Sequence, residues 1–184
     1  MTKSFKNALI GLSLLAATNM APATGAFAED ELEAIGYING RWNAIATYYD
    51  TDHWAAPLAP ARAVADTVMG GAFIRLQMPV AFPGATFQYE MTFSYDRFNG
   101  EYRFGFLDDL NGYLDVYAGQ MQEGIVTVLN ADTGTAFPDG EGGKVIGKLE
   151  LGQTDTGFQI MGYISATKDG PFSPYMKLDF SPAE

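Results

Sequence analysis

The single histidine, His53, lies in an acidic stretch that also holds Asp50 and Asp52. Neighbouring carboxylates can orient an imidazole as a general base or as a metal ligand. A zinc ion, however, needs three or four protein ligands, and the chain has no second His and no Cys. The chain also has no histidine late in its sequence that could ligate haem. We therefore predict no metal site and no cofactor.

Acidic residues also occur as close pairs within segments rich in turn-forming residues. The pairs are Asp50 with Asp52, Asp108 with Asp109, and Asp139 with Glu141. Calcium takes six to eight oxygen ligands, and none of these pairs lies in a run with the spacing of an EF-hand loop. Aspartates in turns commonly accept hydrogen bonds from their own backbone, and we expect that role here.

Catalytic signatures are absent from the sequence. Glu90 and Asp115 are carboxylates that two strands could bring together, as in a glycosidase, but nothing in the sequence selects that pair. Ser94, Ser165 and Ser173 lack the context of a nucleophile elbow, and no glycine-rich phosphate loop occurs. We predict no catalytic residues and favour a protein that is not an enzyme.

The clearest pattern is a period-two alternation over residues 85–96. Its apolar positions are Phe87, Tyr89, Met91, Phe93 and Tyr95, and its polar positions are Gln88, Glu90, Thr92, Ser94 and Asp96. Successive side chains of a strand point to opposite faces, so this segment is a half-buried antiparallel strand. A turn at residues 96–100 follows, and Tyr102, Phe104 and Phe106 resume the alternation. The two strands form a hairpin whose polar side faces solvent.

Short strands separated by Gly, Pro, Asn and Asp account for the rest of the chain after residue 39. Besides the hairpin, we expect strands at 41–49, 62–69, 72–78, 113–117, 125–130, 144–151, 157–165 and 175–180. Residues 50–61 and 131–143 are predicted to be surface loops, and residues 29–38 a short helix. Consecutive hairpins predict an all-β, antiparallel up-and-down barrel of about eight to ten strands.

Several motifs support this barrel by resemblance. They are Gly40-Arg41-Trp42, the segments 69–74 and 93–102, and Phe106-Leu107-Asp108. In this order they resemble a bacterial lipocalin-like family known as domain of unknown function 1579, over most of residues 33–180. The resemblance implies a barrel with Trp42 packed across its floor and an internal pocket, and it assigns no activity.

This sequence departs from the pattern of that family and of the lipocalins at three places. Ser94 stands where the family usually has Gly, and Phe106 where it usually has Trp. Lipocalins also place a late arginine over the floor tryptophan. The last arginine here is Arg103, so Lys177 is the residue that would take this role.

The strand aromatics can fill the barrel or line a pocket for one small hydrophobic or amphipathic molecule. On the preferred hypothesis the ligand-binding residues are Trp42, Phe87, Tyr89, Phe93, Tyr95, Phe104 and Phe106. Small inward residues would open the space: Ala44, Ala46, Ala63, Ala65, Gly147 and Gly162. The alternative is a filled barrel, a non-catalytic structural or interaction domain. A void of several hundred Å³ favours the first.

The N-terminus has the features of a signal peptide. Lys3 and Lys6 precede an apolar stretch at 8–17, and Ala26-Phe27-Ala28 forms a small-x-small cleavage site. We expect residues 1–28 to be removed and residues 29–184 to form one periplasmic or secreted domain. Cleavage leaves nine basic and 22 acidic residues, a net charge of −13. Such a chain is not expected to bind nucleic acid or anionic membranes.

Overall fold

The computed structural model describes residues 31–82, 85–139 and 142–184. The expected signal peptide, and residues 29 and 30 of the expected helix, lie outside this part. Strands make up 65% of the structure and helix 6%, so the all-β prediction is confirmed. The short helix predicted near the N-terminus is present at residues 31–33, followed by the 3₁₀ helix η1 (Gly36–Ile38).

Ten antiparallel strands close into a barrel, the upper end of the predicted number. They are β1 (Gly40–Asp50), β3 (Ala61–Val68), β4 (Phe73–Phe82), β5 (Ala85–Asp96), β6 (Glu101–Asp108), β7 (Tyr113–Gln122), β8 (Ile125–Leu129), β10 (Lys144–Thr154), β11 (Gly157–Ser165) and β12 (Ser173–Pro182). Each pairs with the next in this order, and β12 returns to β1. The barrel is therefore an up-and-down meander without an open sheet edge on its wall.

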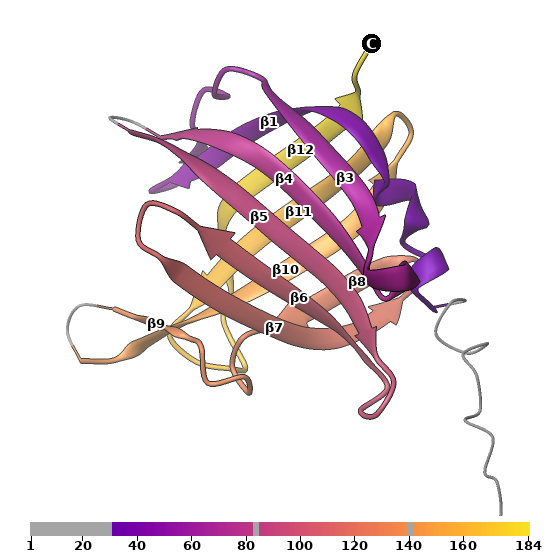
Figure 1. Cartoon of the computed structure of the whole chain (residues 1–184). Helices are drawn as coiled ribbons and strands as arrows, with labels where there is room; N and C mark the ends of the chain where they lie inside the picture. Colours follow the sequence, from indigo (N-terminus) through magenta and orange to yellow (C-terminus); the bar gives the residue numbers. More distant parts are fainter. Residues whose placement is uncertain (1–30, 83–84, 140–141) are drawn as a thin grey trace, which may run out of the picture.

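Two further strands of two residues each lie in segments that we expected to be loops. β2 (His53–Trp54) pairs with β1, and β9 (Phe137–Pro138) pairs with β10. Figure 1 shows β9 at the end of the barrel opposite to the N-terminal helical segment. Among the described residues, no helix has the length and apolar character needed to cross a membrane.

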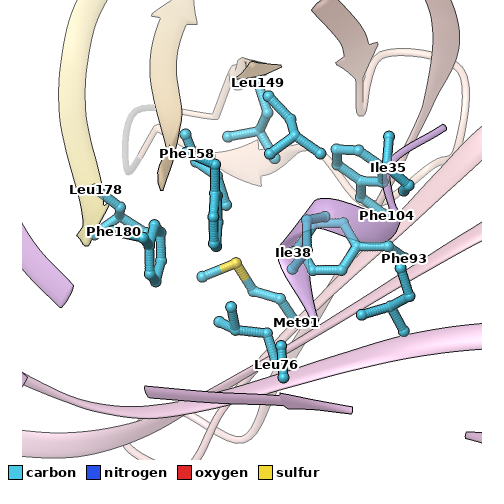
Figure 2. Close-up of a cluster of buried hydrophobic side chains, with 14 of the residues drawn as sticks. Ile35, Ile38, Leu76, Met91, Phe93, Phe104, Leu149, Phe158, Leu178 and Phe180 are labelled. Atoms are coloured by element: carbon cyan, nitrogen blue, oxygen red, sulfur yellow. The ribbon is translucent and has the colours of Figure 1, made fainter. Parts of the chain in front are cut away.

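The β5–β6 hairpin has the predicted register and the predicted buried face. Met91 pairs with Phe106, and Phe93 pairs with Phe104. Met91, Phe93 and Phe104 are buried, and the rings of Phe93 and Phe104 meet edge to face with centroids 4.7 Å apart. Figure 2 shows these side chains converging with those of strands across the barrel. The interior around them is filled.

The helical segment and Trp42 close one end of the barrel. Leu32, Ile35 and Ile38 are buried, and the Trp42 indole nitrogen donates a hydrogen bond to the Ile38 carbonyl oxygen at 2.7 Å. The Trp42 ring meets Phe158 edge to face at 5.0 Å. Trp42 thus lies across the floor of the barrel, as the resemblance implies.

Lys177 does not cover Trp42. The expectation that it takes the role of the late lipocalin arginine was therefore wrong. Its ammonium lies 5.5 Å from the ring centroid of Trp54 and 3.3 Å from an Asp179 carboxylate oxygen. The reason is its place on β12, where Lys177 alternates with the inward-facing Met176 and Leu178. Phe158, and Phe180 stacked on it at 4.2 Å, occupy the space above the floor.

The Gly-Gly motif serves a tight connection between β3 and β4. It lies in the 3₁₀ helix η2 (Met69–Gly71), where Gly70 has φ 67° and Gly71 has φ 93°. Residues other than glycine rarely adopt such backbone angles, so the connection requires glycine at these positions. This explains why the motif marks the start of a strand.

Candidate ligand-binding site

A cavity of about 80 Å³ lies inside the barrel at the end away from the N-terminal helical segment. Its wall is rich in aromatic residues: Tyr89, Phe106, Tyr113, Tyr117, Phe137 and Tyr175. Tyr175 is 44% exposed, so the cavity reaches solvent at this end. At about 13 Å³ for each water, the space holds roughly six waters or one small organic molecule.

Two inward-facing glycines in the cavity wall make room for the side chains of Tyr117 and Met176. A Cβ atom on Gly147 would lie 2.7 Å from the Tyr117 hydroxyl oxygen, and one on Gly162 would lie 3.0 Å from Met176 Cγ. Both glycines line the cavity, as predicted. The small residues predicted on β1 and β3, among them Ala44 and Ala63, are also buried, but around them the barrel is filled.

The aromatic rings form two groups around the space. Phe106 lies 5.7 Å from both Tyr89 and Tyr117, edge to face in each case. On the other side, Tyr113 stacks on Phe137 with centroids 4.8 Å apart and an angle of 22°. Offset-stacked and edge-to-face pairs are the favoured aromatic arrangements, so the wall is well packed.

Asp115 is a fully buried carboxylate in the cavity wall. It accepts hydrogen bonds from Thr135 Oγ1 at 2.5 Å and from Asn130 Nδ2 at 3.1 Å. The Tyr117 side chain lies near this carboxylate as well. A carboxylate has about four acceptor positions, so the two donors leave acceptor positions of Asp115 free.

The same network fixes the loop that follows β8. Thr133 Oγ1 donates to the Val116 carbonyl oxygen at 2.5 Å, and Thr135 Oγ1 accepts from the Val116 amide at 3.0 Å. The Asn130 side chain accepts from the Gly147 amide at 2.8 Å. The loop is thereby held against β7 and β10, which places Phe137 in the cavity wall.

Burial raises the pKa of two of the phenols. It raises the pKa of Tyr117 far above its ordinary value, and the charge of the nearby Asp115 raises that pKa further. Burial also raises the pKa of Tyr89, with smaller contributions from Tyr48 and other groups. Both hydroxyls are therefore neutral hydrogen-bond donors at physiological pH rather than phenolates.

The cavity carries acidic groups without a basic residue. Asp108 and Asp115 line it, and none of the Lys, Arg and His residues in the described part of the chain does. Neither aspartate belongs to any ion pair among the described residues. Asp108 accepts a hydrogen bond from the Asn111 amide at 2.7 Å in the β6–β7 turn. The electrostatic potential inside this end of the barrel is accordingly negative.

The seven residues that we predicted to bind a ligand lie in different parts of the barrel. Tyr89 and Phe106 line the cavity, and Phe87 lies beside Tyr89 with ring centroids 5.3 Å apart. The other four lie elsewhere: Trp42, Phe93 and Phe104 in the filled core, and Tyr95 against Tyr102 near the helical segment. The cavity therefore uses only the part of the hairpin that lies near the β6–β7 turn.

The alternative chemical candidates do not assemble into a site among the described residues. His53 is 67% exposed, and its Nδ1 atom lies 2.9 Å from Asp52. Glu90 accepts a hydrogen bond from Gln77 on the outer surface, whereas Asp115 points inward. Within the described ranges, no three His, Asp or Glu side chains are grouped so that they could hold a metal ion.

Sequence reasoning missed most of the cavity wall. Tyr113, Tyr117, Phe137 and Asp115 come from β7 and from a segment that we expected to be an irregular loop. One usable signal was present. Asp115 alternates with Tyr113 and Tyr117 at period two, so a strand with inward tyrosines also turns this carboxylate inward.

Comparison with protein families agrees with the barrel and its motifs. A family model described as "Protein of unknown function (DUF1579)" matches residues 29–181. No curated protein matches the chain. The match covers nearly the whole of the expected mature domain, from the helical segment at the floor to the end of β12. The chain is thus a member of the DUF1579 family.

Proposed function

We propose that this protein binds one small amphipathic molecule in the cavity at the open end of its barrel. The observation that carries the proposal is the cavity itself. Its wall has aromatic rings, phenolic hydroxyls and a buried carboxylate, and its mouth reaches solvent. Binding sites in proteins commonly combine such apolar walls with a few fixed polar groups. The apolar walls would take up the body of the ligand, and the hydroxyls would orient its polar group.

The volume restricts the size of the ligand. About 80 Å³ is well below the roughly 300–1,000 Å³ of typical small-molecule pockets. It is also below the several hundred Å³ by which we distinguished a hollow barrel from a filled one, so the volume alone favours the filled barrel. A fatty acid or a tetrapyrrole does not fit this space. A cavity that encloses benzene has about 150 Å³, so a one-ring ligand would enter this space only in part and extend into its mouth.

We also propose that the mature protein is exported. The family match begins at residue 29, directly after the Ala26-Phe27-Ala28 cleavage motif. A mass spectrum of the protein from a periplasmic or culture fraction tests this. A mature N-terminus at Glu29 is expected, and an intact N-terminus at Met1 in the cytoplasmic fraction would contradict it.

A filled barrel that acts as an interaction domain is the second candidate. Most of the interior is packed, and two large apolar side chains near the closed end are exposed: Phe98 fully and Met69 to 77%. Phe98 lies in the β5–β6 turn and Met69 in the 3₁₀ helix η2, where a protein partner could reach them. On this reading the cavity is a packing defect that holds water.

Native mass spectrometry of the protein purified from its own source tests ligand binding directly, through a co-purified small molecule. In parallel, benzyl alcohol serves as a neutral amphipathic probe, observed through the NMR signal of the Met176 methyl group, which belongs to the cavity wall. Saturable shifts of that signal are expected.

Two glycine variants locate the binding. Gly162→Ala puts a methyl group into the cavity against Met176, whereas Gly152→Ala puts one on the outer face, 3.6 Å from Ile125. We expect weaker binding in the first variant and unchanged binding in the second. If no molecule co-purifies and the probe gives no response, ligand binding is rejected and the interaction domain remains as the candidate function.

A further inference from the structure

We infer that the molecule bound in this cavity is an organic cation, such as a protonated primary amine. This inference rests on the proposed function, because it specifies the ligand of the same cavity. It is carried by the combination of a buried, unneutralised carboxylate with aromatic walls.

The first argument is electrostatic. Asp115 is fully buried, and its two hydrogen-bond donors are neutral groups: the Thr135 hydroxyl and the Asn130 amide. A buried carboxylate usually has a cationic partner, because hydrogen bonds alone leave its charge uncompensated. Within the described ranges no Lys, Arg or His lines the cavity. A cationic ligand would supply the missing positive charge.

The second argument concerns the walls. Aromatic faces attract cations through the negative potential of the ring, and this attraction is stronger where water is excluded. Phe106 contacts both Tyr89 and Tyr117 in the cavity wall. A carboxylate or phosphate ligand would meet the opposite situation, with two aspartates and no basic group to receive it. The cavity is therefore selective against anions.

The third argument concerns the contribution of each aspartate. Asp115 has acceptor positions left for an ammonium N–H, and the β6–β7 turn brings Asp108 to the same space. Hydrogen bonds between charged partners are about twice as strong as neutral ones. An ammonium group between Asp108 and Asp115 would donate hydrogen bonds to both carboxylates. The apolar body of the ligand would then pack against Phe106.

The test uses three probes of the same skeleton on the mature chain: benzylamine, benzyl alcohol and benzoate. At neutral pH these are a cation, a neutral molecule and an anion. We expect benzylamine to bind at least about tenfold more tightly than benzyl alcohol, and benzoate to give no measurable response. Equal affinity for benzylamine and benzyl alcohol would overturn the cation inference while the proposed function stands. No response to any probe would overturn both.

A charge-neutral variant assigns the preference to the cavity. Asp108→Asn keeps an oxygen that can accept from the Asn111 amide, so the turn is preserved. We expect the ratio of benzylamine to benzyl alcohol affinity to fall at least about threefold. Asp66→Asn is the matched control, because Asp66 is exposed on β3 away from the cavity. If the affinity ratio falls equally in both variants, the preference comes from general attraction of cations to an acidic protein. That result would overturn the inference.

Discussion

The Trp42 indole nitrogen and the Ile38 carbonyl oxygen lie 2.7 Å apart and are buried together at the floor of the barrel. This hydrogen bond joins the first strand to the helical segment that closes the barrel. A buried indole usually has such a partner, because its N–H group is costly to leave unsatisfied. The contact makes Trp42 a structural residue of the closed end.

Replacing Trp42 by Ala is therefore expected to lower the free energy of unfolding by about 3–5 kcal/mol, as for other buried large-to-small changes. Urea denaturation measures the loss. Trp54→Ala is the control, since Trp54 is only half-buried on the outer side of β2, and a smaller loss is expected. A loss below about 1 kcal/mol for Trp42→Ala would contradict a floor role.

The Tyr37 hydroxyl is buried, and no described residue forms a hydrogen bond with it. Tyr37→Phe removes this unsatisfied group and keeps the ring, which lies 6.2 Å from Phe158. We expect unchanged or slightly higher stability, because an unpaired buried polar group costs about 1–3 kcal/mol. Thermal and urea unfolding both report on this. A clear destabilisation would mean that the hydroxyl has a partner, such as an ordered water.

Stability is expected to fall in alkaline solution. Burial raises the pKa of Tyr37 to about 12 and the pKa of Tyr102 to about 12, where the charge of Glu31 contributes as well. In the unfolded chain these phenols titrate near their ordinary value of 10, so between pH 10 and 12 the unfolded state releases protons first. Stability from this source is fully present below pH 10 and declines above it.

Urea midpoints measured on both sides of pH 10 follow this decline, and ultraviolet absorbance of tyrosinate reports the ionisation. The Tyr37→Phe variant removes one contributing group, and its stability is expected to fall less steeply. Equal slopes for the variant and the parent protein would show that Tyr37 is not one of the responsible groups.

Thr135 holds the loop after β8 through its bonds to Asp115 and Val116. Thr135→Ala is expected to cost about 1–3 kcal/mol, because it deprives a buried carboxylate of a donor. Thr156→Ala, in the exposed turn between β10 and β11, is the control and is expected to stay within about 0.5 kcal/mol. Hydrogen exchange of the Val116 amide separates loosening of this loop from global unfolding.

Tyr89 and Tyr95 occupy equivalent positions in the sequence pattern but different places in the barrel. Tyr89 lines the cavity, and Tyr95 packs on Tyr102 near the closed end. Tyr89→Phe is expected to change the affinity for benzyl alcohol while stability stays within about 1 kcal/mol, the net value of one hydrogen bond. Tyr95→Phe is expected to leave the affinity unchanged. Equal effects of the two variants would argue against binding in the cavity.

The strand pattern was predictable because alternation at period two specifies both the strand and its buried face. Residues 85–108 show this best, since a shift of one residue would expose Met91, Phe93 and Phe104 together. The short strands β2 and β9 were not predictable. Each has only two residues, and each forms because of a neighbouring long strand rather than its own pattern.

The candidate site was predictable only in part, because periodicity tells which side of a strand faces inward and not where along the barrel a space remains. Tyr89 and Phe93 share a face, yet only Tyr89 reaches the cavity. The difference comes from what lies opposite in the barrel. Gly147 and Gly162 face the cavity, whereas Phe158 and Phe180 fill the space near the floor. Such pairings across the interior depend on the three-dimensional arrangement of distant strands.

The pairing of β1 with β12 has a consequence for how the chain reaches its native state. Trp42 lies opposite Pro182, so the strand that begins the barrel finds one of its two neighbours on the barrel wall only in the last strand, β12. During synthesis, β1 and β11 must therefore wait with unpaired edges until the last ten residues of the meander emerge. Contacts between such distant residues slow folding, and exposed edges invite association with other chains. A chain cut short before Ser173 would lose the seam of the barrel and become a substrate for chaperones and proteases.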